Sequence, residues 1–387
     1  MNHISEIETP AFVLENACVT SNLRRLQKFG DESGCRVLFS IKSLATRDVL
    51  LAVASFFDGF SASSLFEAQL AREINGDKSL VSYISPILRD HELKELGSLC
   101  DRITVNSLSQ LDRFARRLAK ECEIGLRLNP GVSFVDDPRY DPCRHDSKLG
   151  VPLARFCAAL RSEPEQFANV SGIHFHSNCD SENTDQLIAT IRQVESVLGD
   201  DLRRFRWLNV GGGYLFNESC AVTRTVSEFH RMRERYGLEI VVEPGAAIVR
   251  SAGSLVATVE DIVDGDQQPI AILDTTVNHW PEVFEYQFEP DVAGHVDDGR
   301  FTYLLAGCSC LAGDLFGVYS FNEPLQVGSR VVFRNAGAYS IVKANMFNGI
   351  NLPNVYLLTE GGDLVLVKRF TYEDFASRCG VDSRAVI

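Results

Sequence analysis

The sequence is short of positive charge. Its 387 residues include 38 lysines and arginines against 52 aspartates and glutamates, which gives a formal net charge of −14 and an isoelectric point near 5.1. Binding to nucleic acid needs a basic surface that faces the phosphates, so we exclude nucleic acid as a partner. An acidic protein attracts small cationic molecules instead.

Long apolar runs and paired cysteines are also missing. The longest apolar stretch, 50–57, is far too short to cross a bilayer, so we expect no membrane partner. Residues 1–10 carry no apolar segment typical of a secretory signal. Eleven cysteines, an odd number without any Cys-x-x-Cys pair, therefore predict reduced thiols, a cytoplasmic location and no structural metal.

Short apolar runs alternate with amphipathic stretches through the first two thirds of the chain. Eight runs predict strands, at 37–42, 59–63, 80–85, 102–106, 124–129, 172–178, 207–213 and 240–245. Helices are predicted between them, at 65–74, 108–118, 153–160, 186–198 and 226–236, with Ser64 and Ser107 as caps. Eight strand–helix units predict a (β/α)8 barrel of the TIM type. The alternative, an open doubly wound sheet, calls for a Gly-x-Gly-x-x-Gly turn after the first strand, which is missing.

The pattern changes after Ser254. Strands are predicted there without helices between them, at 255–263, 270–275, 301–306, 330–334 and 356–370, and an early strand at 9–14 is expected to join them. The fold class is therefore α/β, with a barrel at 15–253. A β-rich domain, sandwich-like or barrel-like, is expected to combine residues 1–14 with 254–387.

Lys42 ends the first predicted barrel strand. A lysine is excluded from a core unless something pairs with it, and the carboxyl ends of barrel strands are where such folds do chemistry. A desolvated lysine loses its proton more readily and can form a Schiff base with an aldehyde. Taken alone, a lysine at a strand end that points into water is the simpler interpretation.

The other strand ends carry chemically unusual residues. Arg127 and Asn129 stand at the fifth, Gly211-Gly212-Gly213 at the seventh and Glu243-Pro244-Gly245 at the eighth. Glycine amides can hold an oxyanion, and a buried carboxylate such as Glu243 needs a cationic or N–H partner. The sixth strand holds His174, His176 and Asn178. Each histidine alone is more simply a core residue, and a metal site with Cys179 lacks further ligands.

Together, a lysine, a phosphate cradle, a stacking imidazole and a buried acid predict a pyridoxal phosphate site. A carboxylate that faces the ring nitrogen keeps it protonated, and the ring then accepts the electrons left when a bond to Cα breaks. This arrangement favours decarboxylation.

With these residues in place, the chain resembles the fold-type III, alanine racemase-like pyridoxal phosphate decarboxylases. Within them it resembles the carboxynorspermidine/carboxyspermidine decarboxylases over nearly its whole length. The motifs that carry the resemblance are Thr9-Pro10, the Lys42 strand, SASSLFE at 61–67, GLRLNPGVS at 125–133, SKLG at 147–150, HFHSNC at 174–179, LNVGGG at 208–213, EPG at 243–245, GCSCLAGD at 307–314, NAGAYS at 335–340 and NMFNG at 345–349.

The resemblance implies roles for individual residues. Lys42 forms the Schiff base with the cofactor, His176 stacks on its ring and Glu243 contacts its nitrogen. The remaining cofactor contacts expected are Arg127, Gly212, Gly213, Gly245 and Tyr339. Cys310 is expected to protonate Cα and Asp314 to bind a distal amine, both from the partner subunit of a homodimer. Cys308 is an alternative proton donor, and both cysteines could instead be packing residues.

The segment 274–285 indicates the substrate. It resembles the stretch of this group that usually carries His, Pro, an acid and Glu, and Glu282 and Glu285 could pair with ammonium groups of a polyamine-like substrate. Asp274, His279 and Glu282 are the candidate substrate-binding residues. The simpler alternative is a solvated acidic loop. The expected function is decarboxylation of carboxynorspermidine or carboxyspermidine, cationic amino acids, to norspermidine or spermidine. Glu282 stands where aspartate is usual, and Ala246 replaces the arginine of EPGR.

Three alternatives remain open. One is decarboxylation of another amine-bearing amino acid such as diaminopimelate, ornithine or lysine. Another is a racemase, although these usually face the ring nitrogen with arginine rather than an acid such as Glu243. The third is a cofactor-binding protein without catalysis, which would need only the barrel.

Overall fold

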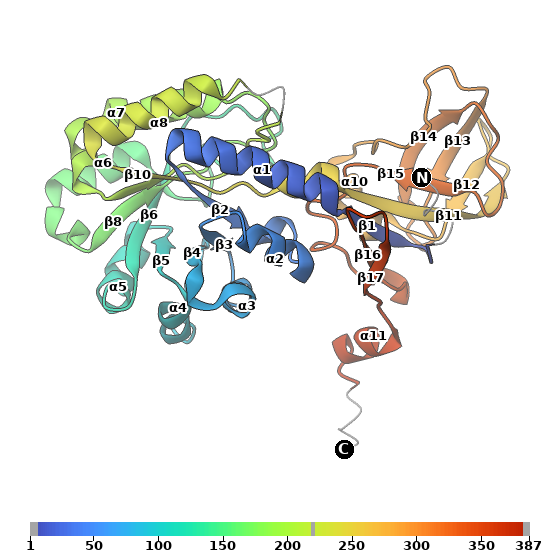
Figure 1. Cartoon of the computed structure of the whole chain (residues 1–387), viewed down its shortest axis with the longest axis horizontal. Helices are drawn as coiled ribbons and strands as arrows, with labels where there is room; N and C mark the ends of the chain where they lie inside the picture. Colours follow the sequence, from blue (N-terminus) through green and yellow to red (C-terminus); the bar gives the residue numbers. More distant parts are fainter. Residues whose placement is uncertain (1–6, 218–220, 382–387) are drawn as a thin grey trace. The chain divides into compact units, whose positions relative to one another are not determined.

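The computed structural model describes residues 7–217 and 221–381 (Figure 1). The chain divides into two compact units. One is formed by residues 20–248, and the other combines residues 1–19 with 249–387. We call them the barrel and the β-domain and describe each by itself.

The barrel is a closed ring of eight parallel strands, as predicted. They are β2 (Arg36–Ser40), β3 (Gly59–Ala62), β4 (Leu80–Ile84), β5 (Arg102–Val105), β6 (Glu123–Asn129), β8 (Val170–His174), β9 (Trp207–Asn209) and β10 (Glu239–Val242). Pairing of Val241 with Arg36 and of Val242 with Val37 closes the ring. A two-residue strand, β7 (Val151–Pro152), adds to the end of β6.

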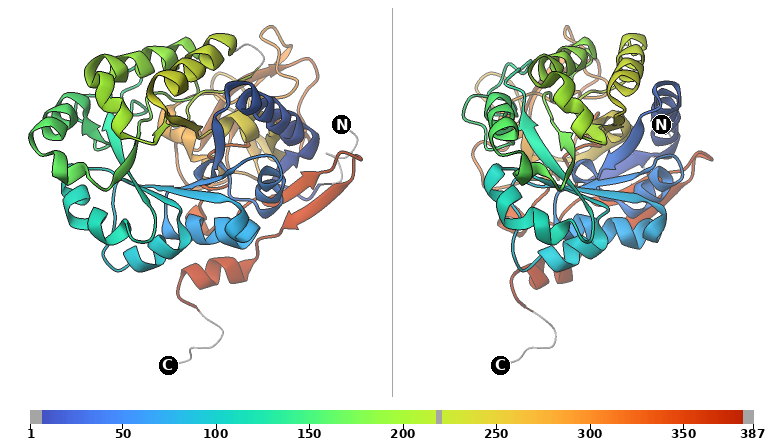
Figure 2. Two further views of the ribbon diagram at one scale, coloured as in Figure 1. Left: turned by 60° about the vertical axis from the view of Figure 1, so that its left-hand side comes forward. Right: turned by 90° about the vertical axis from the view of Figure 1, so that its left-hand side faces the viewer.

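Helices surround the strands (Figure 2). They are α1 (Asn16–Ser33), α2 (Arg47–Ala54), α3 (Leu65–Asn75), α4 (Leu93–Leu99), α5 (Leu108–Leu118), α6 (Leu153–Ser162), α7 (Asp185–Leu198) and α8 (Thr223–Tyr236), and α9 (Ala246–Val249) follows β10. The predicted caps are confirmed, since Ser64 accepts a hydrogen bond from the Glu67 amide and Ser107 accepts one from the Gln110 amide.

One large side chain occupies part of the barrel interior. Trp207 on β9 is 2 % exposed, and an added Cβ at Gly125 or Gly172 would lie 2.3 Å or 2.0 Å from its indole. The guanidinium of Arg102 lies 5.1 Å from the centre of the same ring. Glycine on two strands therefore makes the space that the indole occupies.

The β-domain contains one mixed sheet in the order β14-β13-β12-β11-β1-β16-β17, with β15 paired to β11. Its strands are β1 (Ala11–Glu15), β11 (Gly253–Val263), β12 (Ile270–Leu273), β13 (Phe301–Ala306), β14 (Leu315–Phe321), β15 (Arg330–Phe333), β16 (Asn354–Leu358) and β17 (Leu364–Lys368). The early strand joins this sheet as predicted, because β1 pairs with both β11 and β16. Phe316 stacks on Phe333 in its core, with ring centres 4.5 Å apart.

Three elements differ from the sequence prediction. Strand β14 and two helices, α10 (Pro281–Tyr286) and α11 (Tyr372–Arg378), were not expected in a domain predicted to have strands alone. Most barrel strands end earlier than predicted, by one to four residues, and β2 and β8 are among them. Lys42 and His176 therefore lie on the segments that follow these two strands. Among the described residues, no helix is long and apolar enough to span a membrane.

Candidate active site

Lys42 lies on a short 3-10 turn, Ile41–Ser43, directly after β2. Its two neighbours are buried, whereas its own side chain is accessible to solvent yet closely surrounded by protein atoms. Desolvation lowers the pKa of Lys42, Arg127 lowers it further and Glu243 opposes the change. A lysine with a lowered pKa is a better nucleophile toward an aldehyde.

Glu243 directly follows β10 and is 8 % exposed. Its Oε1 accepts a hydrogen bond from Asn209 Nδ2 at 2.8 Å, and its Oε2 lies 3.6 Å from His174 Nε2. Burial alone would raise the pKa of Glu243, but His174 and Asn209 outweigh burial, and the pKa is lowered. The side chain is therefore held as a carboxylate inside the barrel mouth.

His176 accepts a hydrogen bond at Nδ1 from the amide of Gly212, at 3.2 Å. Desolvation, Lys42 and Arg127 hold the pKa of His176 well below its usual range. The imidazole is therefore neutral at pH 7, and the Gly212 bond places its proton on Nε2. A neutral ring suits stacking on another planar ring.

The glycines after β9 are needed for close backbone approach. A Cβ at Gly212 would lie 2.2 Å from the carbonyl oxygen of Glu243, and one at Gly213, where φ is +89°, would lie 2.0 Å from that of Asn178. The Gly212 amide binds His176, and the Gly211 amide donates to Asn209 Oδ1 at 2.9 Å. Two of the three amides thus position site residues, a use that the sequence analysis did not predict.

Gly245 packs against the segment that carries Lys42. A Cβ there would lie 2.9 Å from the side chain of Ser43, and the Ser40 amide donates to the carbonyl of Pro244 at 3.0 Å. The EPG segment and the Lys42 turn are therefore fixed to each other across the strands β10 and β2.

Arg127 on β6 is a buried cation, 8 % exposed. Burial lowers its pKa to about 10, so the guanidinium stays charged at pH 7. Within the described residues, its Nε has no hydrogen-bond partner. A buried N–H group without a partner is costly, and a bound anion or oxygen ligand would satisfy it.

Glu67, the last residue of the SASSLFE motif, lies near Lys42 and was not among the predicted site residues. Its carboxylate accepts a hydrogen bond from the Ser63 amide at 2.7 Å and interacts electrostatically with Lys42. Burial raises the pKa of Glu67. The SASSLFE motif was the signal for it, because the same spacing that caps α3 brings this carboxylate to the Lys42 side of the barrel.

The β-domain carries Cys308 and Cys310 on the turn between β13 and β14, and both are exposed. Burial of its thiol raises the pKa of Cys308 to about 11, which makes it a poor thiolate at pH 7. The amide of Cys310 donates to Asn348 Oδ1 at 2.8 Å, so the NMFNG segment positions this cysteine.

Asp314 is 3 % exposed and lies beneath the same turn. Its carboxylate accepts hydrogen bonds from the Val277 amide at 2.7 Å, the Ser309 amide at 2.9 Å and the Ser309 hydroxyl at 2.5 Å. Three hydrogen-bond donors of the β-domain therefore bind this carboxylate. The carboxylate of Asp314 therefore holds the cysteine turn, and its contact with a distal amine, which the resemblance implies, stays a prediction.

The predicted substrate segment folds into a turn and α10. His279 is 0 % exposed, its Nδ1 lies 2.9 Å from the Thr275 hydroxyl, and burial lowers its pKa to about 4. Asp274 accepts a hydrogen bond from the Thr258 amide at 2.8 Å, and burial raises its pKa. His279 therefore supports the turn from inside, whereas Glu282, on α10, is partly accessible.

Two further observations concern the β-domain. Tyr339 adopts a left-handed backbone conformation, with φ at 57°, on the NAGAYS loop.

Lys343, which was not among the predicted site residues, forms ion pairs with Glu282 and Glu285.

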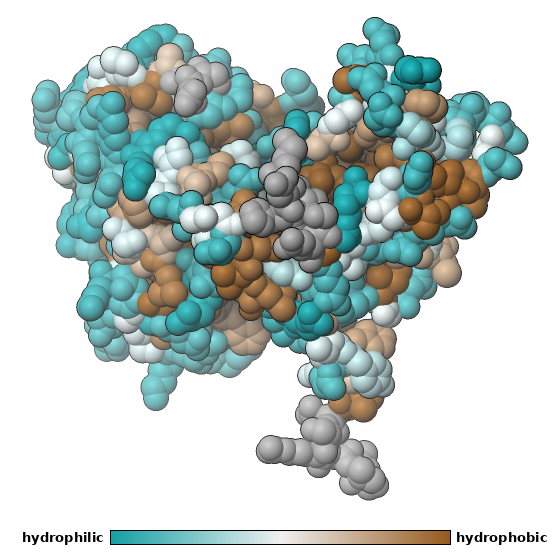
Figure 3. Space-filling view, turned by 45° about the vertical axis from the view of Figure 1, so that its right-hand side comes forward, coloured by the Kyte–Doolittle hydropathy of each residue, from teal (hydrophilic) through white to brown (hydrophobic). Residues whose placement is uncertain are grey.

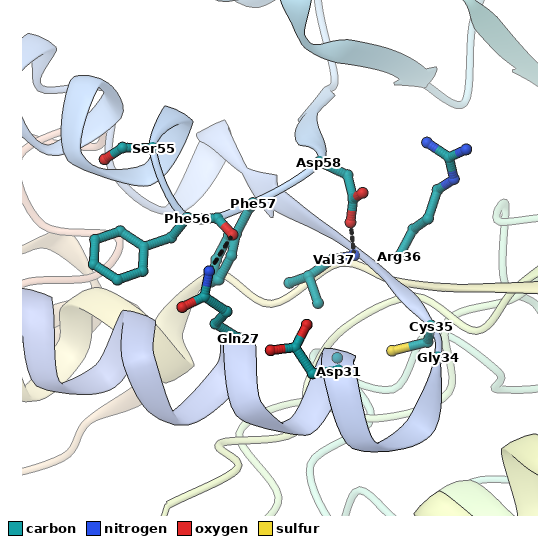
Figure 4. Close-up of a pocket in the computed structure, with 11 residues that line it drawn as sticks. Gln27, Asp31, Gly34, Cys35, Arg36, Val37, Ser55, Phe56, Phe57 and Asp58 are labelled. Atoms are coloured by element: carbon teal, nitrogen blue, oxygen red, sulfur yellow. Dashed lines mark hydrogen bonds between the residues drawn. The ribbon is translucent and has the colours of Figure 1, made fainter.

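A hollow of about 620 Å³ lies elsewhere on the barrel (Figure 4). It is lined by Cys35, Arg36 and Val37 at the start of β2, and Asp58 accepts a hydrogen bond from the Val37 amide at 2.9 Å. Lys42 follows the opposite end of this strand, so the hollow is separate from the candidate site. No cluster of metal-ligating side chains occurs within 7–217 and 221–381.

The barrel mouth thus offers a nucleophilic amine, a buried carboxylate, a neutral imidazole, a buried cation and close backbone turns. This set fits a planar, anionic coenzyme that carries an aldehyde and a basic ring nitrogen. Residues 19–250 match the family model of the pyridoxal-dependent decarboxylases, specifically its pyridoxal binding domain. The chain belongs to this family and is a pyridoxal phosphate-dependent decarboxylase.

Comparison with individual proteins narrows the position within the family. The chain is 32% identical to a carboxynorspermidine/carboxyspermidine decarboxylase of Campylobacter jejuni, covering 96% of this chain and 99% of the relative. It is 34% identical to a carboxyaminopropylagmatine decarboxylase of Synechocystis, covering 97% of each. The crystal structure of carboxynorspermidine decarboxylase from Campylobacter jejuni, complexed with norspermidine, superposes with a TM-score of 0.88 at 31% identity over 96% of this chain and 100% of that one.

Proposed function

We propose that the protein decarboxylates carboxynorspermidine or carboxyspermidine and releases norspermidine or spermidine. The main support is the similarity, over almost the whole of both chains, to the Campylobacter jejuni enzyme solved with norspermidine. The acidic residues Glu282 and Glu285 on α10 support a substrate with distal ammonium groups.

Residues of the barrel prepare the cofactor for this reaction. Pyridoxal phosphate, when bound, supplies the electron sink for the electron pair left by the departing carboxylate. Lys42 would hold it covalently, His176 would cover its ring and Arg127, Gly213 and Gly245 would bind its oxygens. Glu243 would keep a proton on the ring nitrogen, because Asn209 and His174 hold it as a carboxylate.

The β-domain would supply the proton that replaces carbon dioxide on Cα. Cys310 is the proposed donor because its thiol is exposed and Asn348 fixes its backbone. Asp314 would hold the turn, and Tyr339 would contact the cofactor phosphate.

We also propose that the protein works as a cytoplasmic homodimer, with Cys310 acting in the partner's site. Strands at both edges of the β-domain sheet expose apolar side chains, among them Leu315, Val318, Val365 and Leu366. Apolar residues also reach the surface shown in Figure 3. Such surfaces are commonly covered by another chain. The described cysteines are free, which suits a reducing compartment.

The test is to incubate the purified protein and pyridoxal phosphate with carboxynorspermidine, carboxyspermidine, diaminopimelate, ornithine and lysine, and to measure carbon dioxide and the amine product. Turnover of the carboxylated polyamines with at least tenfold higher kcat/KM supports the proposal. Turnover of only diaminopimelate, ornithine or lysine refutes it. Sedimentation of the protein as a monomer while active would refute the shared site.

A second candidate substrate is carboxyaminopropylagmatine. The similarity to the Synechocystis enzyme favours it, because its identity and coverage match those of the Campylobacter jejuni relative. The same assay with this compound, compared at equal concentration, decides between the two.

A further inference from the structure

Lys343 forms ion pairs with Glu282 and Glu285, the two carboxylates proposed to bind the substrate. Its Nζ is 3.6 Å from Glu282 Oε1 and donates a hydrogen bond to Glu285 Oε2. It also lies 5.4 Å from the centre of the Tyr286 ring. The Lys343 side chain is 29 % exposed and that of Glu282 is 13 % exposed, so this contact is partly shielded from water.

The contact is built from two segments that hold each other. Glu282 and Glu285 are three residues apart on α10, so their side chains share one face of the helix. The Lys343 amide donates to the carbonyl of Ser340 at 2.9 Å, and the Asn345 amide donates to the carbonyl of Asn278 at 3.0 Å. These bonds fix the backbone on either side of Lys343, and its side chain therefore contacts α10.

Lys343 remains a cation in this position. Burial by itself would lower its pKa, but Glu285 and Glu282 outweigh burial and raise it. A permanent positive charge thus faces the same carboxylates that a substrate ammonium would approach.

We propose that Lys343 is a specificity-determining residue. It is an internal cation that limits how many ammonium groups of a polyamine chain can bind to Glu282 and Glu285, the acid pair on α10. This inference rests on the proposed function. Each ammonium group that approaches Glu282 and Glu285 must share them with Lys343 and is repelled by it. The residue therefore disfavours chains with an additional cation more than short diamines.

The test compares Lys343→Met with the wild type by calorimetry, with the cofactor-loaded protein and two probes, norspermidine and 1,3-diaminopropane. Norspermidine should bind the variant about tenfold more tightly, the effect of removing one partly solvated like-charge contact. Binding of 1,3-diaminopropane should change less than threefold. The gain in norspermidine affinity of Lys343→Met over the wild type should be smaller at 0.5 M salt. The variant should also have a lower KM for carboxynorspermidine with little change in kcat.

Two variants serve as controls. Lys343→Arg keeps the charge and should restore wild-type discrimination. Lys368→Met removes a lysine that likewise pairs with a carboxylate, Asp374 at 3.0 Å, and lies 5.0 Å from an aromatic ring, and it should leave both affinities unchanged.

The outcomes separate the two claims. Unchanged or weaker norspermidine binding by Lys343→Met, with a wild type that decarboxylates carboxynorspermidine, overturns the role of Lys343 alone. Equal weakening for both probes assigns Lys343 to holding α10 and also overturns it. A wild type that binds neither amine and does not decarboxylate carboxynorspermidine overturns the proposed function together with this inference.

Discussion

Replacing Asn209 by alanine tests the central electrostatic claim about the barrel site. Asn209 Nδ2 donates to Glu243 Oε1 at 2.8 Å, and both side chains are buried. A hydrogen bond to a charged group contributes about 1.5–3 kcal/mol. If that stabilisation acts on the carboxylate that faces the cofactor, kcat/KM at pH 7 should fall roughly tenfold to 150-fold.

The lowered pKa of Glu243 determines the direction in which pH should change the activity and stability of the variant. The pKa of Glu243 is lowered in the folded protein, so its contribution to stability is present above the unfolded-state pKa and is lost as pH falls through the folded-state pKa. Asn209→Ala raises the folded-state pKa. The acid limb of the pH–rate profile should therefore move to higher pH, and the stability difference from the wild type should be full at pH 7 and narrow in acid.

Asn106→Ala is the matched control. Asn106 is also buried, donates through Nδ2 to the Lys148 carbonyl at 2.9 Å and accepts from the Gly150 amide at 2.9 Å. It makes as many side-chain hydrogen bonds as Asn209 but none with Glu243. It should lose comparable stability without moving the acid limb. Equal shifts of the acid limb in both variants, or no shift in Asn209→Ala, would refute the reasoning.

Three further predictions concern the cofactor, the proton donor and the barrel interior. Lys42→Ala should remove the visible absorbance that pyridoxal phosphate gives when covalently held, and a band retained after gel filtration would contradict the role of Lys42. Cys310→Ala should lower the rate of product formation by about a hundredfold, as expected for loss of a general acid, while Cys308→Ala stays within threefold. The opposite order would assign the proton to Cys308. Gly172→Ala should destabilise the protein by about 3 kcal/mol in urea unfolding, because its Cβ would lie 2.0 Å from the Trp207 indole, and Gly361→Ala, whose Cβ meets only contacts of 3.7 Å or more, should stay near the wild type.

The sequence predicted the barrel well because its signals are local. Each strand is a short apolar run, and Ser64 and Ser107 cap helices through bonds to residues three positions away. Strand β14 and helix α10 were not predicted because their sequences depart from the usual local patterns of strands and helices. Gly317, with φ at +133°, breaks the alternation that would have marked β14. No helix was predicted within 274–285, although Pro281 stands at the first position of α10, where proline is favoured.

The sequence indicated the residue types of the candidate site but not the hydrogen bonds between them. Lys42, His176 and Glu243 could be proposed as site residues because each stands at or near the end of an apolar run, and the structure brings their charges close together. The uses of Gly212 for His176 and of Asn209 for Glu243 join residues 36 and 34 positions apart, which spacing in the sequence does not reveal.

Lys343 shows why specificity is harder to predict than chemistry. The acid pair on α10 indicated a cationic substrate by its charge alone, and that argument holds for any two neighbouring glutamates. Its partner lies 58 residues from Glu285 in the sequence, and only the fold brings the lysine to the helix. The number of cations that the pair binds therefore depends on a residue that no local pattern marks, so relatives that keep both glutamates but differ at this position should differ in preferred amine while retaining the same decarboxylation.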